Sequence, residues 1–257
     1  MSRAGPGSMS ALLGRGGFGD VYRGTWRGES VAVKYPRLSR LDDAATRELT
    51  SEAELHIQLR HPRIVQLYGI VSLPSDEPCM VMELMKCSLS ELLHETPLQF
   101  LSWERRTTIC LQVVGGLRFL HSRRILHRDL SSHNVLLDND FNVKLTDFGQ
   151  ARIKAESKTI PIPQGEAQRG KPGWMAPELF DCTGGEPKFS VSSDVYSLGV
   201  VVWEVASRAE PFKDCPYLSI GVTVHSLGHR PSPIPPNAPA EFVEILGDKT
   251  GKGLLGC

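Results

Sequence analysis

The chain has 257 residues, of which 40% are hydrophobic and 23% charged, an ordinary composition for a globular protein with a substantial buried core. Lys and Arg together number 29, as do Asp and Glu, so the net charge of zero excludes a strongly basic protein that binds nucleic acid through its overall field. The six cysteines include no C-x-x-C pair, and the longest apolar run, near 198–206, is too short to span a bilayer, which predicts reduced thiols, no membrane segment and a cytoplasmic location.

The first third of the chain, about 11–85, predicts β-strands with a single helix inserted. Residues 21–26 and 31–34 are rich in β-branched and aromatic side chains, which favour strands. They are joined at Arg27-Gly28, so the two strands are expected to form a hairpin.

A helix is predicted over 41–59, where Ala, Leu, Glu and Arg are frequent, and Pro62 prevents its continuation. Its apolar side chains recur at roughly helical spacing: Leu49, Ala53, Ile57 and Leu59. Two further strands are predicted at 64–71 and 79–84, because turn-forming residues at 74–78 separate two strand-like runs.

The chain after residue 85 is mostly helical in pattern. A short helix is predicted at 88–94, a long one at 103–122 with Ser102 as its N-cap, and a buried one at 193–206. The Pro-rich run 231–239 predicts a turn-rich connector. One face of the long helix is apolar: Ile109, Val113, Leu117 and Leu120.

A glycine-rich run precedes the hairpin and consists of Gly14, Gly16, Gly17 and Gly19. A G-x-G-x-x-G pattern alone also fits a dinucleotide fingerprint or a plain turn. A dinucleotide fingerprint opens a helix, however, whereas β-formers follow this run at once. Glycines at a hairpin tip let backbone N–H groups approach phosphate oxygens closely, which predicts a phosphate-binding loop with Val21 placed to cover a base.

Lys34 ends the strand that follows the glycine run, a position that suits contact with the α- and β-phosphates of a nucleotide. Such a lysine needs a carboxylate to hold it, and Glu52 on the following helix is the predicted partner. Glu48, one helical turn earlier on a similar face, is the alternative. Both acids would otherwise be ordinary surface residues.

The middle of the chain contains two motifs that are far more specific than the glycine run. His-Arg-Asp at 127–129 is followed by Asn134, and Asp-Phe-Gly stands at 147–149. With the glycine run and Lys34, this order and spacing resembles the protein kinase superfamily, whose catalytic and metal-binding loops contain these sequences. Trp-Met-Ala-Pro-Glu at 174–178 resembles the end of the kinase activation segment.

The resemblance implies an α+β, bilobal protein-kinase-like fold. A small N-terminal lobe, 11–85, would hold an antiparallel β-sheet and one helix, and a larger, mainly α-helical C-terminal lobe would occupy 86–246. Residues 1–10 would be a flexible leader and residues 247–257 an atypical tail. The arginine that pairs with the glutamate matching Glu178 has no counterpart here, so the C-terminal lobe is expected to be incomplete.

The implied activity is that of a protein kinase, which transfers the γ-phosphoryl group of ATP, with Mg²⁺, to Ser or Thr hydroxyls of protein substrates, or alternatively to Tyr. Ser/Thr kinases commonly have Lys two residues after the catalytic Asp, and tyrosine kinases have Ala there and Arg four residues after it. This chain has Ser131 and His133, and Lys171 stands where Ser/Thr kinases usually have Thr. These departures resemble the tyrosine-kinase-like group, whose members mostly phosphorylate Ser and Thr.

Two other functions stay open, an ATP-binding pseudokinase that acts as a scaffold and a truncated, inactive kinase fragment. The oligomeric state is left open as well.

The roles of individual residues follow from their match to the kinase motifs. Asp129 is predicted to accept the proton of the substrate hydroxyl, and Arg128 to pair with a phosphate on Ser157 or Thr159 of the activation loop. Asp194 is predicted to hydrogen-bond the backbone of the catalytic loop. The predicted catalytic set is Asp129, Lys34, Glu52, Arg128 and Asn134.

The predicted ligand contacts follow in the same way. Asn134 and Asp147 are the predicted Mg²⁺ ligands. Residues 82–85 match the hinge between the lobes, whose backbone would hydrogen-bond adenine. The predicted nucleotide-binding residues are Leu13, Gly14, Gly16, Gly17, Gly19, Val21, Ala32, Lys34, Met82, Glu83, Met85, Ser88, Leu136 and Asp147.

Overall fold

The computed structural model describes residues 7–16, 19–35, 43–72, 78–96, 100–153, 160–161, 171–181, 188–247 and 253–255. The helices are α1 (Asp43–His56), α2 (Trp103–Ser122), α3 (Val191–Ser207) and α4 (Ala240–Leu246). The longer strands are β1 (Gly7–Gly16), β2 (Gly19–Trp26), β3 (Glu29–Tyr35), β4 (Leu67–Ser72) and β5 (Pro78–Glu83). The short strands are β6 (Cys87–Ser88), β7 (Ile125–Leu126), β8 (Val135–Leu137), β9 (Val143–Leu145), β10 (Arg152–Ile153), β11 (Ile160–Pro161) and β12 (Lys188–Phe189).

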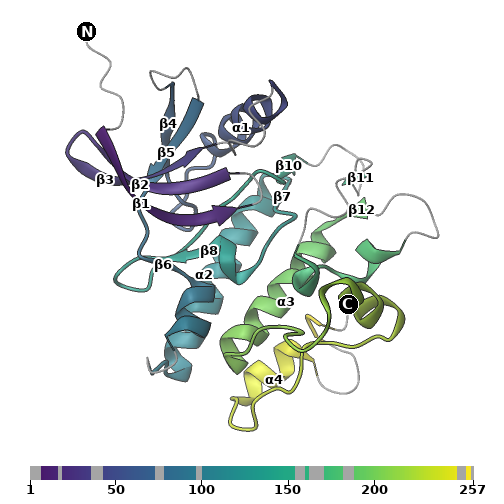
Figure 1. Cartoon of the computed structure of the whole chain (residues 1–257). Helices are drawn as coiled ribbons and strands as arrows, with labels where there is room; N and C mark the ends of the chain where they lie inside the picture. Colours follow the sequence, from purple (N-terminus) through teal and green to yellow (C-terminus); the bar gives the residue numbers. More distant parts are fainter. Residues whose placement is uncertain are drawn as a thin grey trace.

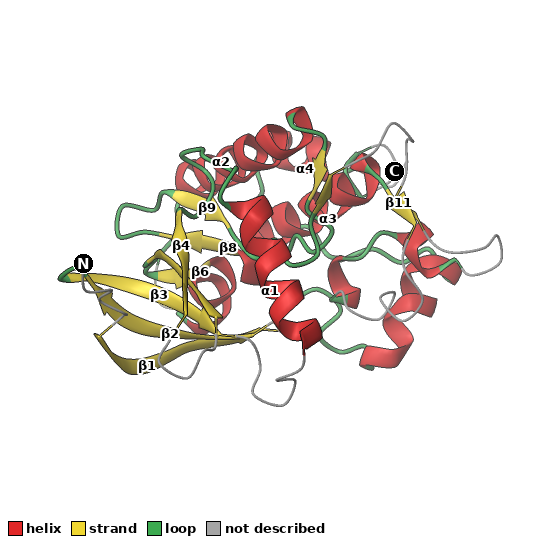
Figure 2. Cartoon of the chain, turned by 90° about the horizontal axis from the view of Figure 1, so that it is seen from above, coloured by secondary structure: helices red, strands yellow, loops and turns green. Residues whose placement is uncertain are grey.

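Strands β1 to β5 form one antiparallel sheet in the order β1-β2-β3-β5-β4. Helix α1 packs against β4 and β5 of this sheet, and the helical region that contains α2, α3 and α4 follows in the chain (Figure 1). Seen from above, α1 lies beside the strands of this sheet (Figure 2). This arrangement confirms the predicted α+β, bilobal fold.

The alternation of side chains along β3 gives the sheet two different faces. Val31 and Val33 belong to an apolar cluster on one face. Ala32 belongs to a cluster on the opposite face, together with Leu49 of α1. Lys34 shares the face of Ala32, so the strand geometry itself directs its side chain toward α1.

The predicted hairpin is present, with β2 and β3 paired from Asp20–Tyr35 to Trp26–Glu29. Arg27 and Gly28 at its tip have φ values of 55° and 86°. Two successive residues with positive φ are typical of the two-residue turn that matches the twist of the flanking strands. The local sequence therefore determines this turn.

The first strand begins earlier than predicted. β1 starts at Gly7, which pairs with Thr25 of β2, so the prediction of a flexible leader over 1–10 is wrong for its last four residues. Gly, Ser and Met give little strand signal. Pairing of the backbone with β2 extends β1 instead.

Helix α1 is shorter than the predicted helix over 41–59, and one predicted core residue is exposed. Leu49 and Ala53 are buried as expected, but Ile57 lies just beyond the helix end and is 46% exposed. His56 is the last residue of α1 and is buried in its place. The prediction favoured the apolar side chain at 57, although His56 is the residue one full turn after Glu52.

Two other boundaries differ from the predictions. The strand expected at 64–71 begins at Leu67, because Ile64 forms an isolated bridge with Leu145 of the large lobe. The helix expected at 88–94 begins as strand β6, and a single wide helical turn follows at Glu91–Glu95. In both places a pairing with a distant strand, β9 or β8, competes with the local preference.

Helices α2 and α3 form the centre of the large lobe. α2 has its predicted bounds, and the hydroxyl of Ser102 accepts a hydrogen bond from the backbone N–H of Arg105. α3 begins two residues before its prediction, because Ser190 and Ser193 cap its start reciprocally. The predicted connector 231–239 contains neither helix nor strand.

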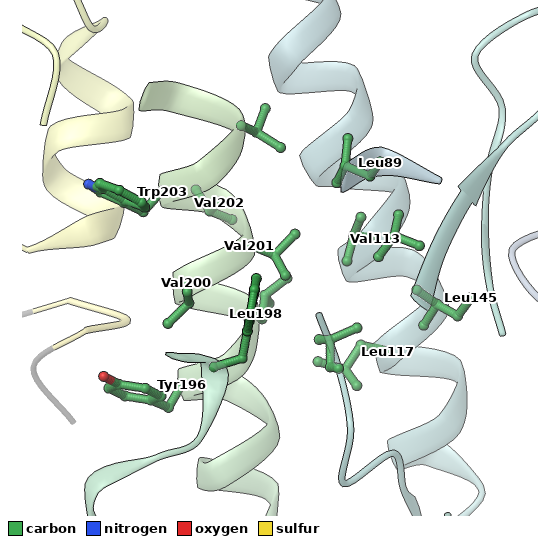
Figure 3. Packing of buried hydrophobic residues seen from close by; sticks show 14 of the residues in the cluster. Leu89, Val113, Leu117, Leu145, Tyr196, Leu198, Val200, Val201, Val202 and Trp203 are labelled. Carbon is green, nitrogen blue, oxygen red and sulfur yellow. The ribbon is translucent and has the colours of Figure 1, made fainter. Parts of the chain in front are cut away.

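The apolar faces of α2 and α3 meet in the main core. The four predicted core residues of α2 are each no more than 3% exposed: Ile109, Val113, Leu117 and Leu120. Figure 3 shows Leu198 and Val201 of α3 pointing toward Val113 and Leu117 of α2. This core fixes the two helices from which the catalytic loop is held. Within the described residues, no helix is both long enough and apolar enough to cross a membrane.

Candidate active site

Lys34 lies at the centre of the site and joins three elements. Its Nζ donates to both carboxylate oxygens of Glu52 on α1, at 2.7 and 2.8 Å, and to Oδ1 of Asp147 at 2.9 Å. The predicted pairing of Lys34 with Glu52 is therefore confirmed, whereas the side chain of Glu48 lies outside the described residues. The side chain of Lys34 is 6% exposed, and that of Glu52 is 3% exposed.

The charged groups in this cluster stabilise one another in their ionised forms. Burial alone would lower the pKa of Lys34, but the negative charges of Asp147 and Glu52 outweigh it and raise the pKa above its ordinary value. Burial would raise the pKa of Asp147, but Lys34 reverses this effect and lowers that pKa. Lys34 is thus cationic and Asp147 anionic near neutral pH.

Asp129 and Asn134 meet in the catalytic loop, a contact that the sequence analysis did not predict. The amide Nδ2 of Asn134 donates to Oδ2 of Asp129 at 2.9 Å and to its main-chain oxygen at 2.7 Å. These bonds commit the NH₂ group of Asn134 and leave its Oδ1 as an acceptor for a metal ion. Asp129 is 8% exposed and Asn134 is 5% exposed.

The pKa of Asp129 is raised above its ordinary value. Burial is the main cause, the positive charge of Lys171 opposes it, and the negative charge of Asp147 adds to it. A carboxylate with a raised pKa accepts a proton more readily, which suits a general base.

Two residues of the site adopt a backbone conformation that is uncommon for side chains other than glycine. Arg128 has a φ of 67° and Asp147 has a φ of 64°. Strained positions of this kind persist where the surrounding structure enforces them. For Arg128, the enforcing contact comes from Asp194 of α3, whose carboxylate accepts the backbone N–H groups of His127 and Arg128, both at 2.9 Å. The predicted role of Asp194 is confirmed.

Glu204 is a second anchor on α3, and the sequence patterns did not single it out. It is fully buried, and its carboxylate accepts bonds from Ser132 Oγ at 2.8 Å and Trp174 Nε1 at 2.6 Å. Its Oε1 also lies 3.2 Å from Nε2 of His94. Glu204 therefore ties the catalytic loop to the segment that follows the activation loop. A charged residue inside an apolar helix was the available signal.

His56 is another functional candidate that the patterns missed. Its Nε2 lies 2.7 Å from the carbonyl oxygen of Val65, so Nε2 carries the proton. The imidazole packs edge-on against Phe148 of the Asp-Phe-Gly motif, with ring centroids 4.8 Å apart, and His127 lies on that phenyl ring at 5.5 Å. Since Glu52 precedes His56 by four residues, one face of α1 holds both Lys34 and Phe148.

The glycine run and the hinge form the predicted nucleotide site. Gly16 pairs with Gly19 across the β1–β2 hairpin, and Gly17 lies outside the described residues. A Cβ on Gly19 would approach the carbonyl oxygen of Tyr35 to 2.1 Å, so only glycine fits, whereas the space around Gly14 is open. Five of the predicted nucleotide contacts belong to or pack against one apolar cluster: Val21, Ala32, Met82, Met85 and Leu136.

Three of the predicted nucleotide contacts have features that their motifs did not indicate. Leu13 is 41% exposed on β1. The Glu83 carboxylate accepts hydrogen bonds from the backbone N–H of Gln66 at 2.6 Å and from Lys144 at 2.7 Å. Its side chain is therefore engaged within the protein. The hydroxyl of Ser88 accepts from the N–H of Glu91 at 3.1 Å. Nucleotide contact by these three residues stays a prediction.

The guanidinium of Arg128 packs against an aromatic ring. Its guanidinium lies over the ring of Phe189, 4.3 Å from the ring centroid, and the residue is 6% exposed. The proposed phosphate acceptors, Ser157 and Thr159, lie outside the described residues. The pairing of Arg128 with a phosphate stays a prediction.

Lys171 and His133 are two of the three departures from the kinase pattern, and Lys171 lies beside Asp129. Lys171 Nζ is 3.2 Å from Oδ2 of Asp129. The ring of His133 packs on Trp174 at 5.5 Å, and its Nε2 lies 3.4 Å from Ser90 Oγ. Desolvation of that ring, followed by the positive charge of Lys171, lowers the pKa of His133 to about 4, so it is neutral at pH 7.

The residues present fit ATP with Mg²⁺. Among the described residues, no group of three or more His, Cys, Asp or Glu side chains could hold a metal ion by itself. Mg²⁺ does not require such a group, because it takes oxygen ligands and is often bound by one or two carboxylates, waters and substrate phosphates. Asp147 offers carboxylate oxygens and Asn134 offers its amide Oδ1, which matches that donor set.

The chain matches a family model described as "Protein tyrosine and serine/threonine kinase" over residues 8–249. It is 35% identical to "Probable serine/threonine-protein kinase drkA" of Dictyostelium discoideum over 243 residues, which cover 93% of this chain and 36% of that protein. It is 36% identical to "Serine/threonine-protein kinase CTR1" of Arabidopsis thaliana over 208 residues, which cover 80% of this chain and 24% of that protein. The chain therefore spans about a third or less of the length of these relatives.

Proposed function

Because this chain belongs to the protein tyrosine and serine/threonine kinase family, we propose that it transfers the γ-phosphoryl group of ATP to serine and threonine hydroxyls of protein substrates. The names of its relatives support this substrate class. The free thiols of Cys79, Cys87, Cys110 and Cys215 support a cytoplasmic location.

The observation that carries the proposal is the contact of Lys34 with both Glu52 and Asp147. Phosphoryl transfer depends on positioning and on charge neutralisation more than on covalent chemistry. In this arrangement one buried cation fixes the helix α1, the strand β3 and the metal-binding aspartate in a single geometry. The pseudokinase alternative loses support, because it would not require these three groups to be assembled.

Different residues of the site would bind the phosphates, bind the metal ion and accept the proton. Lys34 would neutralise the α- and β-phosphates, and the open backbone around Gly14 would admit phosphate oxygens. Mg²⁺, held by Asp147 and Asn134, would supply neutralisation of charge on the phosphates. Asp129 would orient the substrate hydroxyl and accept its proton through Oδ1, since no described residue hydrogen-bonds this oxygen, whereas Asn134 and Lys171 occupy Oδ2.

The test is phosphorylation of a serine- or threonine-containing protein by the chain, with the variant Asp129→Asn beside the wild type. The asparagine keeps the size of the side chain but cannot accept the hydroxyl proton, so the rate of transfer should fall by about 10²- to 10⁴-fold. Nucleotide binding, measured by calorimetry with Mg-ADP, should remain within about twofold of wild type. Phosphoamino-acid analysis of the product identifies the hydroxyl.

Asp140→Asn is the matched control, because Asp140 is an exposed aspartate on a loop outside the site and undergoes the same chemical change. It should transfer phosphate at the wild-type rate. Retention of transfer in Asp129→Asn would contradict the role of Asp129. Label found only on tyrosine would contradict the proposed substrate class.

A further inference from the structure

Phosphoryl transfer places negative charge on the oxygens of the transferred group. Enzymes commonly neutralise this charge with the side chain of a Lys or Arg. Lys34 cannot serve at that point, because its Nζ is held between Glu52 and Asp147. The catalytic loop supplies no cation at the positions that follow Asp129 either, and the guanidinium of Arg128 before it lies over Phe189. Ser131 and His133 stand at the positions two and four residues after Asp129, and the ring of His133 turns to Trp174.

Lys171 places a positive charge next to Asp129 from a segment that is distant in the sequence. It lies 42 positions from Asp129 in the sequence, yet its Nζ is 3.2 Å from Oδ2 of Asp129. The side chain of Lys171 is 34% exposed, whereas the side chain of Asp129 is 7% exposed. The partly exposed lysine therefore lies against a buried carboxylate.

We propose that Lys171 is a catalytic residue that contacts the transferred γ-phosphoryl group and supplies the cation that is missing two and four residues after Asp129. The proposal rests on the proposed kinase function. The hydroxyl oxygen of the substrate forms a bond to the γ-phosphorus while the bond from that phosphorus to the departing ADP oxygen breaks, and the hydroxyl proton passes to Asp129. Lys171 bridges the carboxylate and the oxygens of the phosphoryl group, and is neither consumed nor deprotonated.

The first experiment compares nucleotide affinities of the 257-residue chain by calorimetry in the presence of Mg²⁺. A non-hydrolysable ATP analogue contains the γ-phosphoryl group and ADP does not. Lys171→Met should weaken binding of the analogue about tenfold, as expected for the loss of a charge-assisted hydrogen bond, and leave ADP binding within about twofold. Lys188→Met, at an exposed lysine on β12, is the matched control and should change neither affinity.

The second experiment measures steady-state kinetics and rescue. Lys171→Met and Lys171→Thr should lower kcat about 100-fold while KM for the protein substrate changes little. Adding Ser131→Lys to Lys171→Thr restores a cation to the catalytic loop and should recover at least about a tenth of wild-type kcat. A melting temperature near that of wild type would show that each variant folds.

Several outcomes would overturn the inference alone, while the wild type still transfers phosphate. These are an unchanged kcat in Lys171→Met, a raised kcat, which would mean that the lysine blocks Asp129, and an equal loss of affinity for ADP and the ATP analogue. A wild-type chain that binds neither nucleotide would overturn the proposed function, and this inference with it.

Discussion

His56 is a buried histidine at the end of α1 that packs against Phe148 of the Asp-Phe-Gly motif. It is 1% exposed, and its Nδ1 has no hydrogen-bond partner among the described residues. Burial lowers the pKa of His56 from 6.5 to about 4. The imidazole is thus held neutral, which is the form that can donate to Val65 while resting against Phe148.

This burial has a consequence for stability as a function of pH. Between about pH 6.5 and pH 4 the unfolded chain binds a proton at His56 that the folded chain does not, so the free energy of unfolding falls as the pH falls through this window. The difference between the two pKa values corresponds to about 3 kcal/mol. His56→Leu should remove this contribution, and urea unfolding at several pH values measures it.

At pH 7 the leucine variant should be less stable than wild type by about 1–3 kcal/mol, since the buried carbonyl of Val65 loses its donor. Its deficit should shrink, or reverse, as the pH is lowered toward 4. A difference between the two proteins that stays constant over this range would contradict the burial of a neutral histidine.

Helix α2 shows how packing overrides local preference at the scale of an element. Gly115 and Gly116 are adjacent in the middle of this helix, where glycine lowers stability by roughly 0.5–1 kcal/mol relative to alanine. A Cβ on Gly115 would have no atom nearer than 3.8 Å. A Cβ on Gly116 would lie 2.9 Å from Cδ1 of Leu145 and 3.1 Å from the carbonyl oxygen of Arg63.

The two alanine substitutions should therefore have opposite signs. Gly115→Ala should raise the free energy of unfolding by about 0.5–1 kcal/mol through helix propensity. Gly116→Ala should lower it by about 1–3 kcal/mol, because α2 must move away from β9 and the loop before β4. Chemical denaturation of both variants checks this, and a stabilised Gly116→Ala would contradict the close approach.

Helix α3 acts as the anchor of the catalytic machinery. Asp194 near its start holds the backbone before Asp129, and Glu204 near its end holds Ser132 and Trp174. Both acids are buried in a helix whose other contacts are mainly apolar. The largely hydrophobic helix α3 therefore also determines where the charged catalytic groups lie.

At the scale of the whole molecule, the two lobes are linked by charged groups and backbone pairing. Lys34 of the small lobe reaches Asp147, Lys144 reaches Glu83 at 2.7 Å, and Val65 donates its N–H to the carbonyl oxygen of Leu145 at 2.9 Å. A nucleotide that binds between Lys34 and Asp147 would add to these links, and its binding should stabilise the folded chain.

Thermal unfolding measures this effect. Mg-ADP at about 100 times its dissociation constant stabilises a protein by about 2.7 kcal/mol, which should raise the melting temperature of this chain by about 5–10 °C. Lys34→Met should lose most of this rise at the same nucleotide concentration, because the phosphates lose their cation. Asp129→Asn should keep it. An equal rise in wild type and Lys34→Met would indicate another phosphate anchor.

The sequence by itself determined the features that depend on local chemistry. The hairpin turn at Arg27-Gly28, the bounds of α2 and the cap at Ser102 follow from neighbouring residues, and the spacing from Asp129 to Asn134 was enough to recognise the kinase motif. The pairing of Lys34 with Glu52 was also predictable, because a strand end and a helix face each have a fixed direction.

Only the tertiary structure decided the features that join distant segments. The start of β1, the end of α1 and the short strand β6 depend on pairing or packing with partners far along the chain. For the same reason no sequence pattern indicated that Glu204 reaches Trp174, that His56 rests on Phe148, or that Lys171 reaches Asp129. The type of a residue and its position in the sequence are the same whether its side chain faces solvent or a buried charge. Only the folded chain distinguishes these two cases.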